Sequence, residues 1–176
     1  MDQSDYQKKI NDDVSLTFDD VLLLPNYAEI KREDIDLTTQ VTQQIKLNIP
    51  LLSSPMDTVT TSQMAIALGF LGGLGFIHRN MDIVAQQTEV KKAKEKTALV
   101  GAAVGIGNDL EERVEALISA GCDVIIIDSA HGFSKWVIEA TRLISQKKKS
   151  IGLISGSVAT FLEQKLLLKP VLKVSG

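Results

Sequence analysis

The sequence has a single cysteine, Cys122, so no disulfide can form within the chain. It also lacks an apolar stretch of the ~18 residues that a membrane-spanning helix needs. The nearest stretch, residues 64–77, is shorter and contains several glycines. The first residues are polar and charged, unlike a secretory signal or a membrane anchor. These absences lead us to expect a cytoplasmic protein without a membrane segment.

Histidine is scarce as well, and the chain has no excess of positive charge. The formal net charge of −3 argues against a general nucleic-acid binder, and the lysine runs at 91–96 and 147–149 are typical of solvated helix ends. The two histidines, His78 and His131, have no cysteine or carboxylate partner at ligand spacing. We therefore expect neither nucleic-acid binding nor a metal site.

Short apolar runs alternate with helical stretches along the chain. Residues 124–127, one valine and three isoleucines, are apolar on both faces, as in a parallel strand covered on both sides. Strands joined by helices predict a parallel α/β fold, either a (β/α)₈ barrel or a doubly wound sheet. A complete barrel needs about 250 residues, so a barrel here would be incomplete. Six strands are expected, at 51–54, 73–78, 99–104, 124–128, 151–155 and 171–174.

Capping signals mark the helices between these runs. Asn108, followed by Glu111 three positions later, resembles a capping box. Gly121 is expected to end the helix that follows. The expected N-caps of the four helices are Ser62, Asp82, Asn108 and Ser134.

Asp128 is the most informative residue of the chain. Ligands of α/β folds bind at the carboxyl ends of the strands, and Asp128 ends an apolar run. A buried carboxylate there is costly unless it is paired or directed at a ligand. Such a carboxylate can accept two hydroxyls of a ribose. A cap for the helix near Ser134 is the alternative, but Asp128 lies several residues too early for it.

The other candidates leave alternatives open. His131 is either a general base or a loop residue, and His78 either contacts a base or ribose or hydrogen-bonds the rim of the barrel. The Gly-x-Gly within residues 101–107 lacks the third glycine of a dinucleotide fingerprint and is weak evidence for a phosphate site. Cys122 directly precedes a buried strand, which predicts packing rather than nucleophilic catalysis.

Five segments, in order, resemble the IMP dehydrogenase / GMP reductase family. They are LTFDDVLLLP at 16–25, PLLSSPMDTVT at 50–60, GGLGFIHRNM at 72–81, VGAAVG at 100–105 and DSAHG at 128–132. The residues around Leu24 and around Ser54 favour IMP dehydrogenase over GMP reductase. The resemblance implies one TIM (β/α)₈ barrel domain over 1–176, incomplete, with an N-terminal arm at 1–48 and strands 1 to 6 at 49–176.

The resemblance also implies an activity, the NAD-dependent oxidation of IMP to XMP in guanine nucleotide biosynthesis. In this family a cysteine attacks C2 of the purine, and hydride transfer and hydrolysis follow. Ser54 and Met56 would lie along bound IMP. Ser157 occupies the position of the family's substrate-contacting Asn, and its shorter side chain puts that contact in question.

NAD is the cofactor that the resemblance implies. Asp128 would accept the hydroxyls of the nicotinamide ribose, with Ser129 beside it. His78 would lie near the adenosine end. The agreement on Asp128 is notable, because its place at a strand end predicts ribose binding without the resemblance.

The sequence departs from the family in two larger ways. Residues 90–96 run directly into the third strand, so the regulatory CBS pair is absent. Residues 171–176 lack the Gly-rich loop with the catalytic cysteine, a potassium site and a phosphate-binding serine. We therefore expect a truncated chain without a catalytic nucleophile. The family's potassium ion and homotetramer are expected for a full-length enzyme, and an inactive fragment that binds nucleotide or partner subunits is the alternative.

Overall fold

The computed structural model describes residues 14, 16–147, 151–161, 164–165 and 167. The chain divides into two compact units, 1–35 and 36–176. In the first unit, the described residues include two 3-10 helices, η2 (Phe18–Asp20) and η3 (Arg32–Asp34). Thr17 and Asp20 form a capping box around η2, in which the Thr17 backbone N–H donates to the Asp20 carboxylate at 2.9 Å.

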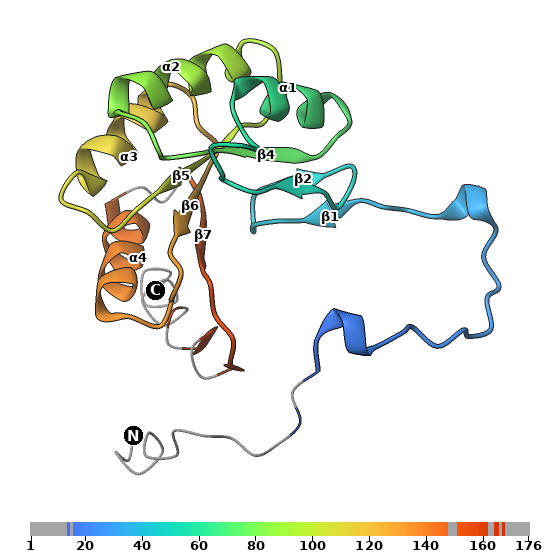
Figure 1. The fold of residues 1–176 in the computed structure, drawn as a ribbon. Helices are drawn as coiled ribbons and strands as arrows, with labels where there is room; N and C mark the ends of the chain where they lie inside the picture. Colours follow the sequence, from blue (N-terminus) through green and yellow to red (C-terminus); the bar gives the residue numbers. More distant parts are fainter. Residues whose placement is uncertain (1–13, 15, 148–150, 162–163, 166, 168–176) are drawn as a thin grey trace. The chain divides into compact units, whose positions relative to one another are not determined.

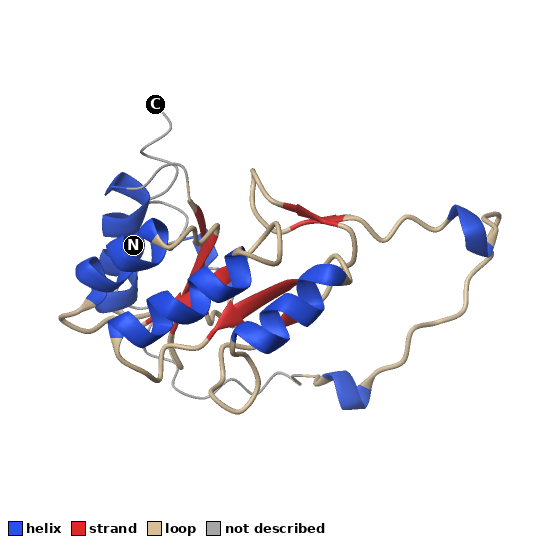
Figure 2. Cartoon of the chain, turned by 90° about the horizontal axis from the view of Figure 1, so that it is seen from above, coloured by secondary structure: helices blue, strands red, loops and turns tan. Residues whose placement is uncertain are grey.

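The second unit contains a parallel sheet whose strand order follows the chain. Its strands pair in the order β3-β4-β5-β6-β7, and every pairing is parallel. Figures 1 and 2 show the sheet curling, with the helices along its outer side. A doubly wound sheet would reverse its strand order and carry helices on both faces. The fold is therefore an incomplete TIM-type barrel. The strands are β3 (Leu52–Ser53), β4 (Leu74–Ile77), β5 (Gly101–Val104), β6 (Val124–Asp128) and β7 (Gly152–Gly156).

Five of the predicted strands are confirmed. Strands β3, β4 and β5 are shorter than expected, β6 has the expected bounds, and β7 begins and ends one residue later; the sixth predicted strand, at 171–174, lies outside the described residues. Only residues 95–100 connect α2 to β5, so no further domain is inserted there. No helix in the described part of the chain is long and apolar enough to cross a membrane. The helices are α1 (Ser62–Phe70), α2 (Ile83–Lys94), α3 (Leu110–Ser119) and α4 (Lys135–Lys147).

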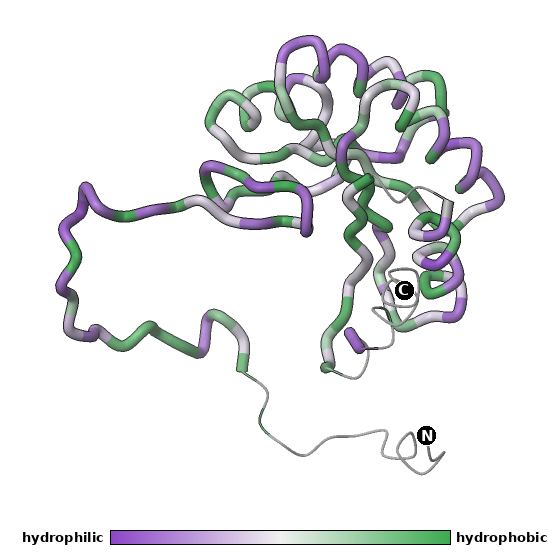
Figure 3. The backbone as a smooth tube through the Cα atoms, turned by 180° about the vertical axis from the view of Figure 1, so that it is seen from behind, coloured by the Kyte–Doolittle hydropathy of each residue, from purple (hydrophilic) through white to green (hydrophobic). Residues whose placement is uncertain are grey.

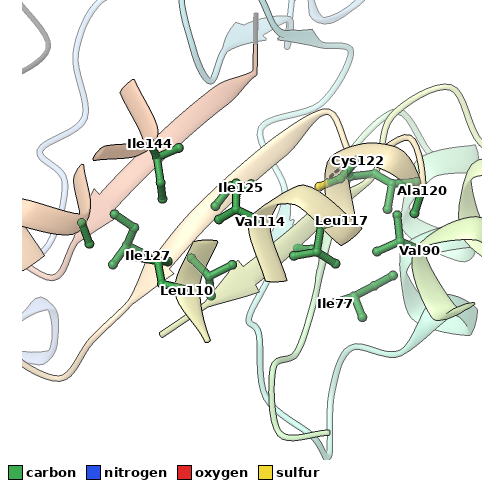
Figure 4. Packing of buried hydrophobic residues seen from close by; sticks show 14 of the residues in the cluster. Ile77, Val90, Leu110, Val114, Leu117, Ala120, Cys122, Ile125, Ile127 and Ile144 are labelled. Atoms are coloured by element: carbon green, nitrogen blue, oxygen red, sulfur yellow. Dashed lines mark hydrogen bonds between the residues drawn. The ribbon is translucent and has the colours of Figure 1, made fainter. Parts of the chain in front are cut away.

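Both faces of the sheet are buried, as the apolar runs predicted. In β6, Ile125 and Ile127 join the cluster under the helices (Figure 4), whereas Val124 and Ile126 belong to a second cluster on the inner face. Side chains alternate between the faces of a strand, so one apolar run supplies both clusters. Figure 3 shows the result, with hydrophobic colour concentrated along the strands and a mixture along the helices.

A small antiparallel hairpin contributes to the inner cluster. It pairs β1 (Thr39–Gln40) with β2 (Lys46–Leu47) and belongs to the second unit. Leu47 is 2% exposed and packs with Leu74, Phe76 and Val124. The hairpin lies within the segment expected as part of the arm, yet it forms core with the strands.

Two predicted helix starts are confirmed, and Gly121 ends α3 as predicted. The Asp82 carboxylate accepts from the Ala85 N–H at 2.8 Å, and the Ser134 hydroxyl accepts from the Val137 N–H at 3.2 Å. Gly121 follows α3 with φ +93°, the left-handed conformation that glycine adopts without steric cost.

The other two predicted caps were wrong. The N-cap of α1 is Thr61, so Ser62 is the first helical residue, and the N-cap of α3 is Asp109, one residue after Asn108. Neither N-cap makes a side-chain capping bond. The Asp109 carboxylate instead accepts from the Arg113 side chain at 2.8 Å.

The start of α1 is stabilised from α2. The Ser62 N–H donates to Glu89 Oε2 at 2.9 Å, and Lys92 Nζ donates to Glu89 Oε1 at 2.7 Å. Partial burial alone would raise the pKa of Glu89, but the hydrogen bonds from Lys92 and Ser62 outweigh it and lower the pKa from 4.5 to about 2. The Glu89 carboxylate thus serves as a helix cap supplied by a neighbouring helix.

We predict that Glu89→Gln lowers the free energy of unfolding by about 1 kcal/mol at pH 7, because it removes a charged cap. The folded-state pKa is depressed, so the stabilisation is complete above pH 4.5 and is lost as the pH falls toward 2. Urea unfolding of both proteins across this pH range measures the difference. Glu95→Gln, at the exposed residue that follows α2, is the control and should change stability by less than about 0.5 kcal/mol. A difference for Glu89→Gln that stays constant down to pH 2 would contradict the interpretation.

Candidate functional site

A cavity of about 340 Å³ lies at the carboxyl ends of β4, β5 and β6. In barrels of this type, ligands bind at that end of the strands. Asp128 and Ser129, two of the predicted site residues, line the cavity. The full lining is Arg79, Gly105, Ile106, Gly107, Asp109, Arg113, Asp128, Ser129 and Ala130.

Strand β6 places Asp128 at this cavity. Asp128 is two residues beyond Ile126 and four beyond Val124, so it shares their inner face. Its side chain is 43% exposed, so the expectation of a buried carboxylate was wrong. The last residue of the strand has passed the end of the core, where the cavity opens. The carboxylate is therefore available to a ligand.

Arg79 spans three strand ends to reach this carboxylate. It follows β4 in the sequence, and its Nε lies 3.6 Å from Asp128 Oδ2 at the end of β6. Between them it passes Gly105, at the end of β5, where an added Cβ would stand 3.2 Å from Nη1. Glycine at this position leaves the space that the guanidinium occupies.

A second arginine, Arg113 of α3, is buried in the cavity wall. It is 9% exposed, and its guanidinium donates to Asp109 Oδ2 at 2.8 Å, to Gln86 Oε1 at 2.8 Å and to the Met81 carbonyl at 3.1 Å. The Gln86 amide in turn donates to the Ala103 carbonyl at 2.8 Å. This network joins α2, α3 and the end of β5, so it fixes the part of the cavity wall that Arg113 and Asp109 form.

The loops after β6 and β7 are joined by backbone hydrogen bonds. The Ser157 N–H donates to the Ser129 carbonyl at 3.1 Å, and the Gly132 N–H donates to the Ser157 carbonyl at 2.8 Å. Ser157 therefore lies beside Ser129, although it is exposed and does not line the cavity. His131, in the same loop, is exposed and contacts Phe133 edge to face.

Ser54 and Met56 lie elsewhere on the same edge of the sheet, in the loop after β3. Both are exposed, and neither lines the cavity. The loop is held by Thr60, whose hydroxyl donates to the Ser54 carbonyl at 2.6 Å. The structure thus brings Asp128, Ser129 and Ser157 together and leaves Ser54 and Met56 apart from them.

His78 is 6% exposed and follows β4. Its imidazole Nδ1 accepts a hydrogen bond from the Asn80 backbone N–H at 3.1 Å. The backbone N–H of His78 donates to the Thr60 carbonyl at 3.2 Å. Of its two alternatives, these bonds favour a role in the rim of the barrel. No cluster of three or more potential metal ligands occurs among the residues that the structure describes.

Cys122 belongs to the hydrophobic core, as the sequence predicted. It is 7% exposed, and its thiol donates to the Val124 carbonyl at 3.2 Å (Figure 4). Burial raises the pKa of the thiol to about 12. The reactive thiolate is therefore negligible near neutral pH, and the hydrogen-bond partners of the thiol among the described residues are two backbone carbonyls, those of Val100 and Val124, rather than a titratable base.

Comparison with known proteins places these features in a family. Residues 15–174 match the IMP dehydrogenase / GMP reductase domain. The chain belongs to this family. An inosine-5′-monophosphate dehydrogenase of Borreliella burgdorferi is 38% identical, over 83% of this chain and 48% of its own length. Those of Cryptosporidium parvum and Aquifex aeolicus are 37% and 35% identical, over 82% and 94% of this chain and 46% and 31% of their own lengths. The chain thus spans about half the length of the first two relatives.

Three residues in or behind the cavity wall were not predicted from the sequence. They are Arg79, Arg113 and Gln86. Arg79 stood within the segment that resembles the family, but nothing in the sequence shows that it reaches Asp128. For Arg113 and Gln86, a charged and an amide residue on the buried faces of predicted helices would have been the available signal.

We predict that Arg113→Met lowers the free energy of unfolding by about 2–3 kcal/mol, because Gln86 and the Met81 carbonyl lose a charged donor in a buried setting. Arg113→Lys keeps the charge but cannot donate to three acceptors in the same geometry. Its free energy of unfolding should therefore lie between those of the wild type and Arg113→Met. Thermal unfolding followed by circular dichroism provides the measurement. Equal stability of wild type and Arg113→Met would show that the network does not stabilise the fold.

Proposed function

We propose that the chain binds the nucleotides of an IMP dehydrogenase, with the ribose of NAD at Asp128. The observation that carries this proposal is the open Asp128 carboxylate at a cavity on the ligand-binding edge of the barrel. Family membership supports it independently. In domain terms, we propose a partial catalytic barrel over 49–176, preceded by an arm at 1–48.

The residues of the cavity fit part of NAD. A carboxylate can accept both hydroxyls of a ribose, and Ser129 adds a hydroxyl beside it. A volume of about 340 Å³ suits a ribose and its neighbouring groups rather than a whole dinucleotide. When bound, NAD would supply the acceptor for a hydride. The chain's own contribution is to bind and orient the nicotinamide ribose.

For IMP, we propose contacts with Ser54, Met56 and Ser157. Support comes from their positions, since all three are exposed in loops that follow strands at the same edge of the sheet. Ser157 would make a shorter contact than the asparagine of the family. His78 stays a proposal for the adenosine end of NAD, although its burial favours the rim.

IMP dehydrogenase is proposed over GMP reductase. The matched domain covers both activities, but the relatives described above are all inosine-5′-monophosphate dehydrogenases. The segments around Leu24 and Ser54 support the same choice. A potassium ion and a homotetramer are proposals for a longer chain only.

A second candidate function is nucleotide binding without covalent catalysis. The observation in its favour is Cys122, the sole cysteine of the chain, which is buried with a pKa raised to about 12. The covalent route that the family resemblance implies needs a thiolate that reaches the purine. Cys122 points into the core between β6 and α3 and does not line the cavity.

We predict that the purified chain binds NAD and that Asp128→Asn weakens this binding at least about tenfold, because it replaces a charged acceptor with an amide. Isothermal titration calorimetry measures the dissociation constants. Glu139→Gln, on a half-exposed side chain of α4, removes one negative charge outside the cavity and should change binding by less than about twofold. Equal NAD affinity in Asp128→Asn and wild type would exclude Asp128 as the ribose acceptor.

We further predict that the 176-residue chain does not reduce NAD in the presence of IMP. The reason is that its one thiol is buried and protonated from pH 7 to pH 9, well below its pKa of about 12. NADH absorbance is the assay, and slow alkylation of Cys122 by iodoacetamide in the folded chain is the structural check. NADH formation by a monodisperse sample would refute the prediction, and Cys122→Ala would then show whether this thiol is responsible.

A further inference from the structure

We propose that Arg79 is a second ligand-binding residue of the cavity and that it binds the diphosphate of the dinucleotide whose ribose Asp128 accepts. This inference rests on the proposed function, because it assumes a nucleotide at Asp128. It adds a contact of opposite charge and extends the site from the end of β6 to the end of β4.

The guanidinium is already held at the cavity. Arg79 follows β4, and its Nε lies 3.6 Å from Asp128 Oδ2. Gly105 lies beneath it, where a Cβ would be 3.2 Å from Nη1 and 3.3 Å from Cζ. The ion pair and the missing side chain at Gly105 together keep the guanidinium beside the carboxylate.

The donors of Arg79 are available to a ligand. The side chain is 46% exposed, and 3.6 Å exceeds the length of a hydrogen bond. Among the described residues, the charged partner of this guanidinium is Asp128, and no hydrogen bond accompanies that ion pair. Arg113, in the same wall, is different because it donates to Asp109, Gln86 and Met81. Arg79 therefore has N–H groups that can donate to a ligand, whereas Arg113 uses its N–H groups within the protein.

The two charges suit a ribose joined to a phosphate. Ribose hydroxyls donate to a carboxylate, whereas phosphate oxygens accept from a guanidinium, whose planar fork matches their geometry. The Asp128 carboxylate repels a phosphate, so the phosphate is directed to the Arg79 side of the cavity. A nucleoside without phosphate would use Asp128 alone. This difference separates a binding role of Arg79 from a general effect on the site.

The test compares two ligands with the same nicotinamide ribose, NAD and nicotinamide riboside. We expect Arg79→Gln to weaken NAD binding about tenfold, the usual effect of losing one charged hydrogen-bonding partner. Binding of nicotinamide riboside should be unchanged or slightly tighter, because that ligand is itself a cation. Dissociation constants for both ligands come from NMR titration of the 176-residue chain.

Arg142→Gln is the matched control. Arg142 is an exposed residue of α4 outside the cavity lining, and the substitution makes the same change in net charge. It should alter NAD binding by less than about twofold. Gly105→Ala provides a second route, because the added Cβ forces the guanidinium to give way by a few tenths of an ångström and leaves every charge in place. We expect it to weaken NAD binding about threefold or more, with little effect on the riboside.

The outcomes separate this inference from the proposed function. If Arg79→Gln and Gly105→Ala bind NAD like the wild type while Asp128→Asn weakens both ligands, the role of Arg79 is overturned and the ribose site stands. If Arg79→Gln weakens NAD and the riboside equally, Arg79 acts by positioning Asp128, which also overturns phosphate binding. If the wild-type chain binds neither ligand, the proposed function fails and this inference fails with it.

Discussion

The structure depends on the burial of both faces of its parallel strands. In β6, Ile125 and Ile127 pack under the helices, and Val124 and Ile126 fill the inner face. This alternation fixes the register of the strand, because a shift by one residue would exchange the two sets. It also determines where Asp128 points, since that residue continues the inner series. The site is therefore a consequence of core packing two and four residues earlier in the same strand.

Much of the fold could be predicted because its signals are local. The Asp82 cap lies three residues from the N–H that it accepts, and Gly121 directly follows the helix that it ends. One of the two wrong caps is explained by an interaction between residues distant in sequence. Ser62 donates to Glu89, 27 positions away, so the start of α1 needed no cap of its own. The alternation of strands and helices left the barrel and the doubly wound sheet open; the family resemblance implied the barrel, and the strand order confirms it.

The candidate site also contains residues that could be predicted from the sequence and residues that could not. Asp128 and Ser129 could be predicted because one strand and the turn after it place them at the cavity. Arg79 could not, because its position depends on three strand ends meeting at one edge and on Gly105 leaving space between them. The exposure of Asp128 could not be predicted either. An apolar run indicates that a strand is buried but not the residue at which it leaves the core.

The two arginines of the cavity wall show how neighbours determine the role of a side chain. Arg113 has three acceptors arranged by α2 and α3, so its charge is used to join elements of the fold. Among the described residues, Arg79 has one charged partner, Asp128, at 3.6 Å, and nearly half of its side chain is exposed. A buried cation without acceptors is costly, whereas an exposed one can exchange water for a ligand at little expense. The wall can thus be rigid through one arginine while the other remains free to bind. Both arginines line the same cavity, so Arg113 joins the elements around the space that Arg79 and Asp128 border.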